Sequence, residues 1–178
     1  MAYHWHMTSA RDHSSTTRIR AGIVDVLVLS HDSMGHPGAA DAARWQVLVL
    51  RRGPGTRCTG AWEIVHGRIE PGERPDSAAL REIHEETGLA PDRLYSITVN
   101  PFYLVQTDSV ELAIVFAAVV PAGAVPLLGV EHDAWEWLPT SEALTRLAWP
   151  RERDGLLQAL SLLSGGDAGY LDDVLRVR

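Results

Sequence analysis

The hydrophobic positions along the chain fall into runs that predict a mixture of strands and helices. Nearly every residue from Ile23 to Leu29 is apolar, which is typical of a strand buried on both faces. Shorter apolar or β-branched runs follow, bounded by glycine, proline or polar residues. We therefore expect strands over residues 19–30, 45–51, 62–65, 95–105, 110–120 and 135–138, with the second antiparallel to the first.

Helical signals are clearest after residue 74. Pro75 suits the first position of a helix, Asp76 suits its positive end and Gly88 suits a left-handed C-terminal cap, whereas Arg74 is a poor N-cap. Helices are expected over residues 75–87, 141–147 and 151–163. Because strands and helices do not alternate strictly, the pattern favours an α+β fold in which helices cover a mixed sheet.

The polar residues predict the domain limits. We expect a flexible N-terminal arm over 1–18, a surface loop over 31–44, one domain over 19–163 and a C-terminal tail over 164–178. A chain of 178 residues fits a single domain of this kind.

Charge and cysteine content exclude some classes of function. The formal net charge of −7 disfavours a general nucleic-acid or anionic-membrane surface, because both select basic patches. Cys58 is the only cysteine, so no disulfide can form within the chain and a reducing compartment is expected. No apolar run approaches about 18 residues and no signal peptide is found, so we expect a cytoplasmic protein without a membrane segment. A homodimer is left open.

Acidic residues gather in the segment GRIEPGERPDSAALREIHEETGL, residues 67–89. Glu82, Glu85 and Glu86 are three and four positions apart, so they project to one side of the expected helix. Like charges on adjacent turns repel, and either the neighbouring Arg81 or a hard divalent cation can compensate that repulsion. Taken alone, these three residues are also consistent with an acidic helix face in solvent.

The loop before this helix favours a metal site. Gly67, Gly72 and Glu73 lie in a turn-forming sequence, so a backbone carbonyl and a fourth carboxylate can approach the helix carboxylates. Such oxygen donors suit Mg²⁺ or Mn²⁺ beside a phosphate substrate.

The same segment resembles the Nudix box, whose pattern is Gly, five residues, Glu, seven residues, then Arg-Glu-aliphatic-x-Glu-Glu-x-Gly-aliphatic. All fixed positions of the pattern match, which is a far more specific signal than a lone glycine motif. The matching residues are Gly67, Glu73, Arg81, Glu82, Ile83, Glu85, Glu86, Gly88 and Leu89. The flanking strands suit the α/β/α sandwich of that family, so we expect the resemblance to extend over residues 19–163.

The resemblance implies a role for each matching polar residue. Glu82 and Glu85 are implied to be catalytic, with Glu82 one candidate for the general base, and Arg81 and Glu73 are implied to support and orient the helix. The implied ligands of the Mg²⁺ or Mn²⁺ ions are Glu82, Glu85, Glu86 and the carbonyl of Gly67. Family enzymes hydrolyse nucleoside diphosphates linked to a further group, so the expected partner is a small-molecule diphosphate.

The entrance to the box departs from the commonest form of the pattern. It reads Val65-His66-Gly67, where many members have Pro-Gly-Gly, and this is similar to the dihydroneopterin triphosphate pyrophosphatase subgroup. Glu131-His132 resembles a Glu-His segment of the same subgroup, in which the glutamate is thought to join the metal site. Glu131 is therefore a further candidate ligand, or else a surface acid in a loop.

Three residues before the box are candidate substrate contacts. Arg51 and Arg52 end a predicted strand, where they can meet a phosphate or a base, and Trp62 can stack on a base or pterin. The alternatives are two solvent-exposed arginines and a tryptophan packed in the core.

These features together predict a metal-dependent hydrolase. We expect it to split a nucleoside-type triphosphate, either dihydroneopterin triphosphate or a (d)NTP, into the monophosphate and pyrophosphate. The alternatives are a hydrolase of dinucleoside polyphosphates or ADP-ribose, an RNA 5′-pyrophosphohydrolase, and a Nudix-fold nucleotide-binding module without catalysis.

Overall fold

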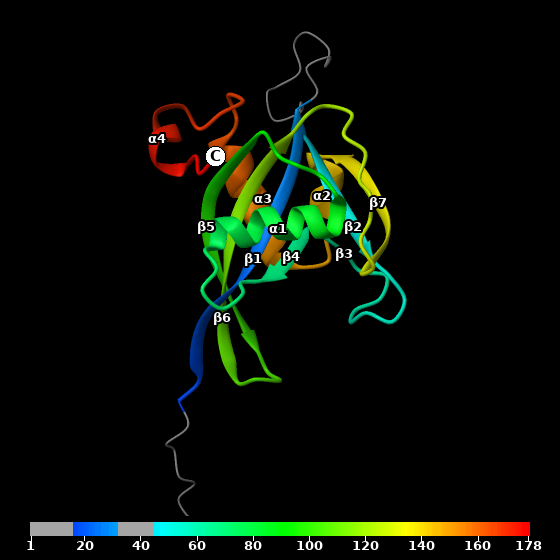
Figure 1. Cartoon of the computed structure of the whole chain (residues 1–178), viewed down its shortest axis with the longest axis vertical. Coiled ribbons are helices and arrows are strands. Elements are labelled where there is room, and N and C mark those ends of the chain that lie inside the picture. The colour runs from blue at the N-terminus through cyan, green and yellow to red at the C-terminus, as the bar shows by residue number, and fades with distance from the viewer. Residues whose placement is uncertain (1–15, 32–44) are drawn as a thin grey trace, which may run out of the picture.

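The sheet is organised around β1 (Arg18–His31), the strand predicted from the long apolar run (Figure 1). It pairs in parallel with β6 and antiparallel with β2 and β4. On the outer sides, β5 pairs with β6, and β3 and β7 both pair with β2. The remaining strands are β2 (Trp45–Arg52), β3 (Trp62–Glu63), β4 (Val65–Arg68), β5 (Arg93–Leu104), β6 (Ser109–Val120) and β7 (His132–Pro139).

This computed structural model describes residues 16–31 and 45–178. The predicted arm up to residue 15 and the predicted loop from residue 32 therefore lie outside the described residues. The helices are α1 (Pro75–Thr87), α2 (Thr140–Arg146), α3 (Pro150–Leu162) and the short α4 (Asp172–Leu175), which follows a 3₁₀ turn at Gly169–Leu171.

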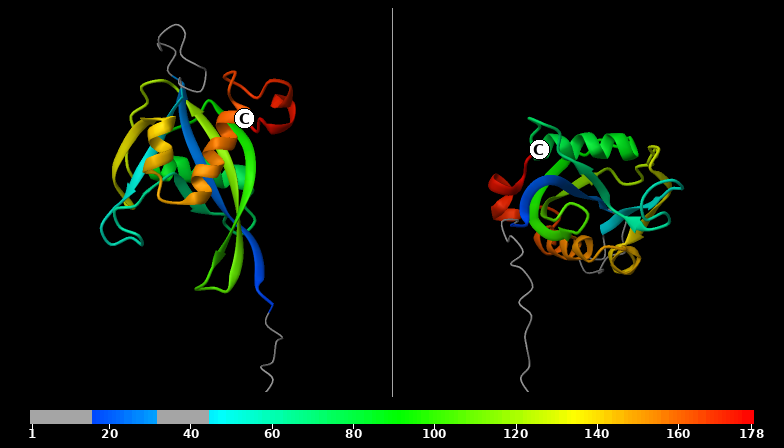
Figure 2. Two further views of the ribbon diagram at one scale, coloured as in Figure 1. Left: turned by 180° about the vertical axis from the view of Figure 1, so that it is seen from behind. Right: turned by 90° about the horizontal axis from the view of Figure 1, so that it is seen from below.

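Helices cover both faces of the sheet. In Figure 1, α1 crosses in front of it, and the reverse view in Figure 2 places α2 and α3 on the opposite face. Alternate residues of β1 face the two layers, with Val26 in the apolar cluster that includes α1 and Leu27 in the cluster that includes α3. Burial on both faces is the reason for the continuous apolar run. The mixed sheet confirms the α+β class and the α/β/α sandwich.

Helix α1 has the predicted bounds and the predicted ends. Pro75 is its first residue, Arg74 makes no side-chain cap, and Gly88 has a φ of 65° while its N–H donates to the carbonyl of His84. Ile83 is fully buried against the sheet. The adjoining arc of the helix carries the carboxylates of the box, of which Glu86 is also buried.

Two segments differ from the prediction. The strand expected over 62–65 is two strands, because the chain changes partner at Ile64, pairing first with β2 and then with β1. The predicted tail returns to the sheet, where the N–H of Leu94 donates to the carbonyl of Arg178 at 3.1 Å and the N–H of Val177 donates to the carbonyl of Leu94 at 2.7 Å. Over the described ranges, no helix has the length and apolar character needed to cross a membrane.

Candidate active site

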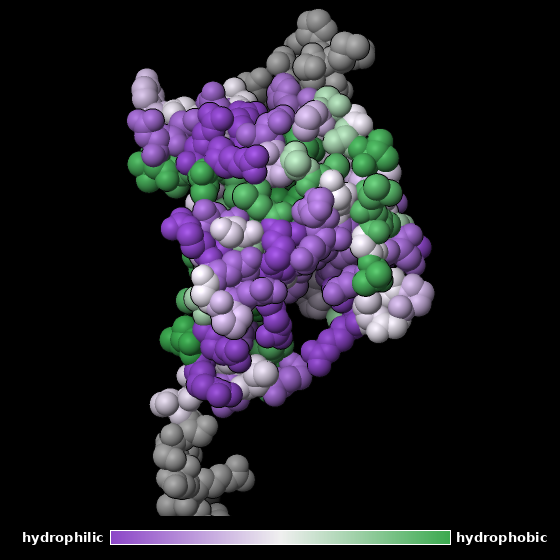
Figure 3. All heavy atoms as spheres, in the orientation of Figure 1, coloured by the Kyte–Doolittle hydropathy of each residue, from purple (hydrophilic) through white to green (hydrophobic). Residues whose placement is uncertain are grey.

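An open pocket of about 1580 Å³ lies beside the carboxylate face of α1. Its other walls come from the β5–β6 hairpin, the loop before β7 and the start of α3. Figure 3 shows the same face, with hydrophilic side chains over α1 and a hollow below it. The predicted site residues that line the pocket are Gly67, Glu82, Glu85, Glu86, Glu131 and Arg52.

Arg81 connects the carboxylates behind the pocket. Its Nε and Nη2 donate to the two oxygens of Glu73 at 3.0 and 2.9 Å, and its Nη1 donates to Glu82 at 2.8 Å and to Glu85 at 3.1 Å. A further bond from Nη2 reaches the carbonyl of Arg68 at 2.8 Å. The hydrogen bond from Arg81 also holds the pKa of Glu73 below its usual value. Arg81 and Glu73 thus fix the helix to the box loop without facing the pocket.

Gly67 leaves the space that Glu82 occupies. A Cβ atom at residue 67 would lie 1.8 Å from the carboxyl carbon of Glu82 and 2.0 Å from its Oε1. Ordinary contacts between carbon atoms are about 3.5–4.0 Å, so no side chain fits there while Glu82 keeps its position. Burial raises the pKa of Glu82, and the hydrogen bond from Arg81 opposes that shift.

Glu86 is the buried carboxylate of the three. Its Oε1 accepts a bond from the N–H of His66 at 3.4 Å, while its Oε2 has no hydrogen-bond partner among the described residues. Burial, reinforced by the charges of Glu82, Glu63 and Glu131, raises the pKa of Glu86 well above its usual value. A buried carboxylate oxygen without a hydrogen-bond partner lowers the stability of the fold unless a bound ligand supplies that partner.

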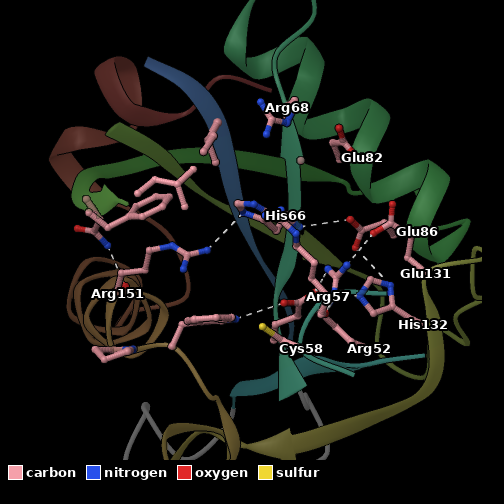
Figure 4. Close-up of a pocket in the computed structure, with 18 of the residues that line it drawn as sticks. Arg52, Arg57, Cys58, His66, Arg68, Glu82, Glu86, Glu131, His132 and Arg151 are labelled. Carbon is pink, nitrogen blue, oxygen red and sulfur yellow. Dashed lines mark hydrogen bonds and ion pairs between the residues drawn. The ribbon is translucent and has the colours of Figure 1, made fainter. Parts of the chain in front are cut away.

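A second buried cluster supports Glu86 from behind. Glu63 accepts bonds from Arg52 at 2.7 Å, His132 at 3.2 Å and Trp149 at 3.3 Å. Burial raises the pKa of Glu63, but His132 and Arg52 outweigh it, so the net shift is downward and the carboxylate is ionised. The other ring nitrogen of His132, Nδ1, lies 3.7 Å from Oε2 of Glu86 (Figure 4).

The donor set fits a hard divalent cation. Glu82, Glu85 and Glu86 offer oxygen atoms at one edge of the pocket, and oxygen is the donor that Mg²⁺ and Mn²⁺ prefer. Two observations support the fit: the unpartnered Oε2 of Glu86 and the space above Gly67 that holds Glu82. Among the described residues, no three acidic, histidine or cysteine side chains are already grouped closely enough to hold an ion. Nη1 of Arg81 instead donates to both Glu82 and Glu85.

Glu131 reaches the pocket from the loop before β7. Its side chain is 57% exposed and lies 3.3 Å from Nη2 of Arg52. The loop is attached to the end of α1, because the N–H of Gly129 donates to the carbonyl of Glu86 at 3.0 Å. A Cβ at Gly129 would lie 2.6 Å from the backbone oxygen of Glu85, so only glycine permits this approach. Glu131 therefore lies on the same side of the pocket as the box carboxylates.

The candidate substrate contacts separate into two groups. Arg52 lines the pocket but is committed to Glu63, Glu131 and the carbonyl of Arg57. Arg51 and Trp62 are not among the residues that line the pocket. Arg51 instead bonds Asp133 at 2.7 Å and lies over the ring of Trp62 at 5.9 Å. Successive strand residues point to opposite faces, which explains why only one of the two arginines reaches the pocket.

The sequence prediction missed a polar cluster on the far side of the pocket. Asp25, from the apolar run of β1, is buried and contacts both His66 and Arg151. The signal for it was a charged residue inside a strand buried on both faces, which is rare unless the charge is paired. Arg151 lies at the start of α3, so no local pattern connects it to β1 or to the box.

An α/β/α sandwich that presents several carboxylates from one helix at the edge of a pocket is typical of proteins that handle phosphates with divalent cations. The family model described as the NUDIX domain matches residues 30–160. The chain therefore belongs to the Nudix family, whose hydrolases act on phosphorus-containing anhydrides.

The known relatives that match the chain have names that give different activities. An RNA pyrophosphohydrolase of Brucella ovis is 31% identical over 129 residues, which cover 56% of this chain and 68% of that protein. An octanoyltransferase of Myxococcus xanthus is 38% identical over 122 residues, 64% of this chain and 32% of that protein. The chain spans a third or less of the length of the first curated relatives that it matches.

A solved structure shares the fold. The dihydroneopterin triphosphate pyrophosphohydrolase of E. coli has a TM-score of 0.57 and 22% sequence identity, covering 76% of this chain and 92% of that one. This likeness concerns the fold and not the substrate.

Proposed function

We propose that the chain is a metal-dependent hydrolase that cleaves a nucleoside-type triphosphate into the monophosphate and pyrophosphate. Dihydroneopterin triphosphate and the (d)NTPs are the first substrates to test. One observation carries the proposal: two carboxylates lie together at one edge of an open pocket. Glu82 occupies the space above Gly67, and the buried Glu86 has one oxygen without a hydrogen-bond partner among the described residues.

The residues of the pocket fit the needs of this reaction. A divalent cation held by Glu82, Glu85 and Glu86 would supply positive charge to the diphosphate and acidify the attacking water. Burial raises the pKa of Glu82, which makes its carboxylate a better proton acceptor and supports it as a candidate base. Arg57 and Arg68 also line the pocket and can attract phosphate oxygens.

Glu131 and the Gly67 carbonyl complete the proposed metal site. Glu131 lines the same pocket, and Gly67 lies in β4 directly beside Glu82. Glu73 and Arg81 contribute by holding α1 against the box loop.

A panel of substrates tests the proposal. Dihydroneopterin triphosphate, (d)NTPs, a dinucleoside tetraphosphate, ADP-ribose and a 5′-triphosphorylated RNA are incubated with Mg²⁺ or Mn²⁺, and released phosphate and pyrophosphate are measured. We expect pyrophosphate from a triphosphate. Cleavage of the RNA alone would favour the activity named for the Brucella relative, and no cleavage of any compound would refute the enzyme proposal.

Glu85→Gln separates a hydrolase from a binding module. The substitution removes one carboxylate from the proposed metal site and should abolish turnover while leaving the fold intact, because Glu85 is 55% exposed. Glu142→Gln is the matched control, since Glu142 is an exposed residue of α2 outside the pocket. A wild-type protein that binds the nucleotide as tightly as Glu85→Gln, but turns over none of it, would support the module.

A further inference from the structure

Asp25 holds two pocket residues whose side chains the box chemistry does not use. Its Oδ1 accepts a bond from Nδ1 of His66 at 2.6 Å, and its Oδ2 accepts a bond from Nε of Arg151 at 2.9 Å. A second contact joins Nη2 of Arg151 to Oδ1 at 3.3 Å. The Asp25 side chain is 1% exposed, and these two residues are its hydrogen-bond partners. The buried Glu152 also belongs to this cluster, with its Oε1 3.7 Å from Nη2 of Arg151. His66 and Arg151 are therefore fixed side by side on one buried carboxylate.

The two residues present complementary groups to the pocket. Burial raises the pKa of Asp25, but His66 and Arg151 outweigh it, so the pKa is lowered and the carboxylate accepts from Nδ1–H of His66. The exposed part of the ring is then the opposite edge, which carries Nε2, a hydrogen-bond acceptor in the neutral ring. Nη1 of Arg151 donates no hydrogen bond within the described residues, although Arg151 lines the pocket. One acceptor and one donor thus lie next to each other.

The position of this pair relative to the carboxylates matters for what it can bind. Figure 4 shows His66 between Arg151 and Glu86. The backbone N–H of His66 donates to Glu86, and the ring of His66 contacts Asp25. His66 therefore lies between the carboxylate end of the pocket and the end formed by Arg151. The carboxylates and Arg151 therefore line two ends of one pocket, and a substrate with its diphosphate at the carboxylates would have Arg151 within the same pocket.

Arg151 is poorly suited to a phosphate. Its charge is balanced by Asp25, with Glu152 also 3.7 Å from its Nη2. Its guanidinium lies 4.7 Å from the ring centre of Phe102 and 5.6 Å from that of Trp149. Arg57 and Arg68, by contrast, form no ion pair in the ranges that the structure covers, and both line the pocket. A neutralised donor framed by aromatic rings suits a flat, uncharged ligand with polar edges.

We propose that His66 and Arg151, positioned by Asp25, form the subsite that recognises the planar heterocyclic base of the substrate. Nη1 of Arg151 donates to a ring nitrogen or carbonyl of the base, and Nε2 of His66 accepts from the neighbouring N–H. Purines and pterins carry such a donor beside an acceptor on the edge of a planar ring, whereas ribose phosphates without a base have no planar ring. This inference rests on the proposed function and adds the residues that select the substrate.

Conservative variants test the subsite without removing the partner of Asp25. Arg151→Lys keeps a positive charge beside Asp25 but loses the planar donor set, and His66→Gln keeps a donor for Asp25 but loses the ring acceptor. Arg153→Lys is the matched control, because Arg153 lies on the same helix outside the pocket. For the best triphosphate substrate, we expect KM to rise about tenfold in each subsite variant, with kcat within threefold of wild type. The control should change neither.

Binding of monophosphates separates this inference from the proposed function. Calorimetry compares GMP, AMP and ribose 5-phosphate on the wild type and the variants, with thermal melts to verify folding. The affinity for GMP and AMP should fall about tenfold in both variants, and the affinity for ribose 5-phosphate should be unchanged. Equal weakening of all three ligands would make the pair a phosphate site, and unchanged GMP and AMP binding would overturn the proposal. If wild type cleaves no substrate, the proposed function fails, while this comparison still decides the base subsite.

Discussion

Replacing Gly67 with alanine is the most direct test of how the box places Glu82, the proposed catalytic carboxylate. The new Cβ would lie 1.8 Å from the carboxyl carbon of Glu82 and 2.3 Å from its Cγ. To restore an ordinary contact, the carboxylate has to move by about 2 Å. Misplacement of a catalytic group by about 1 Å can cost 100-fold in rate, so we expect kcat/KM to fall by at least about 100-fold, or about 2.7 kcal/mol.

The same structure predicts that the fold survives this change. The atoms that clash belong to the end of a flexible side chain, and Gly67 has no left-handed φ that alanine would strain. The melting temperature in EDTA should therefore stay within a few degrees of wild type. Gly22→Ala is the matched control, because a Cβ at Gly22 meets nothing within 4 Å, and it should keep full activity.

A double substitution isolates the cause. When Glu82 is already alanine, the new Cβ at residue 67 no longer meets a carboxylate. Adding Gly67→Ala to Glu82→Ala should therefore lower kcat/KM no further. Steady-state rates with the best substrate and Mg²⁺, together with thermal melts, measure both effects. Full activity of Gly67→Ala would refute the reasoning, and so would equal losses from Gly67→Ala with and without Glu82.

Three further substitutions test other contacts. Burial raises the pKa of Glu86, so the folded protein keeps a proton that the unfolded chain releases, and metal-free stability falls as pH rises above the ordinary glutamate value near 4.5. Glu86→Gln should therefore melt higher than wild type at pH 8 in EDTA, with the difference vanishing near pH 4, while turnover is lost. Arg81→Lys cannot reproduce the two-pronged contact with Glu73 and should cost about 1–3 kcal/mol in urea unfolding as well as activity. Gly129→Ala meets the rigid backbone oxygen of Glu85 at 2.6 Å and should lower the melting temperature, whereas Gly165→Ala, with open space around it, should not. If Arg81→Lys or Gly129→Ala is as stable as the wild type, the contact proposed to stabilise that position is wrong.

The parts of the molecule that depend on local chemistry were predictable from the sequence. The bounds of α1 follow from Pro75 and Gly88, and the central strand follows from its apolar run. The contact between Arg81 and Glu85 follows from helical spacing, since residues four apart lie on one side of a helix.

Contacts that depend on register and on distant segments were not predictable. Arg51 and Arg52 are equivalent candidates until the sheet decides which faces the pocket, and an irregularity in the pairing of β2 with β7 lies between them. Asp25 and Arg151 are 126 residues apart, so only the packing of α3 against the sheet brings them together. The split of the strand at Ile64 likewise depends on which neighbour each half finds.

The contacts of Arg81 have a consequence for when the protein can fold. Its guanidinium supplies an internal counter-ion to Glu73, Glu82 and Glu85, so part of their mutual repulsion is relieved by the chain itself. Small metal domains that lack such a substitute remain unfolded until the ion arrives. Here the helix can form first and bind a cation afterwards, so we expect a chelator to inhibit the proposed reaction reversibly without unfolding the chain.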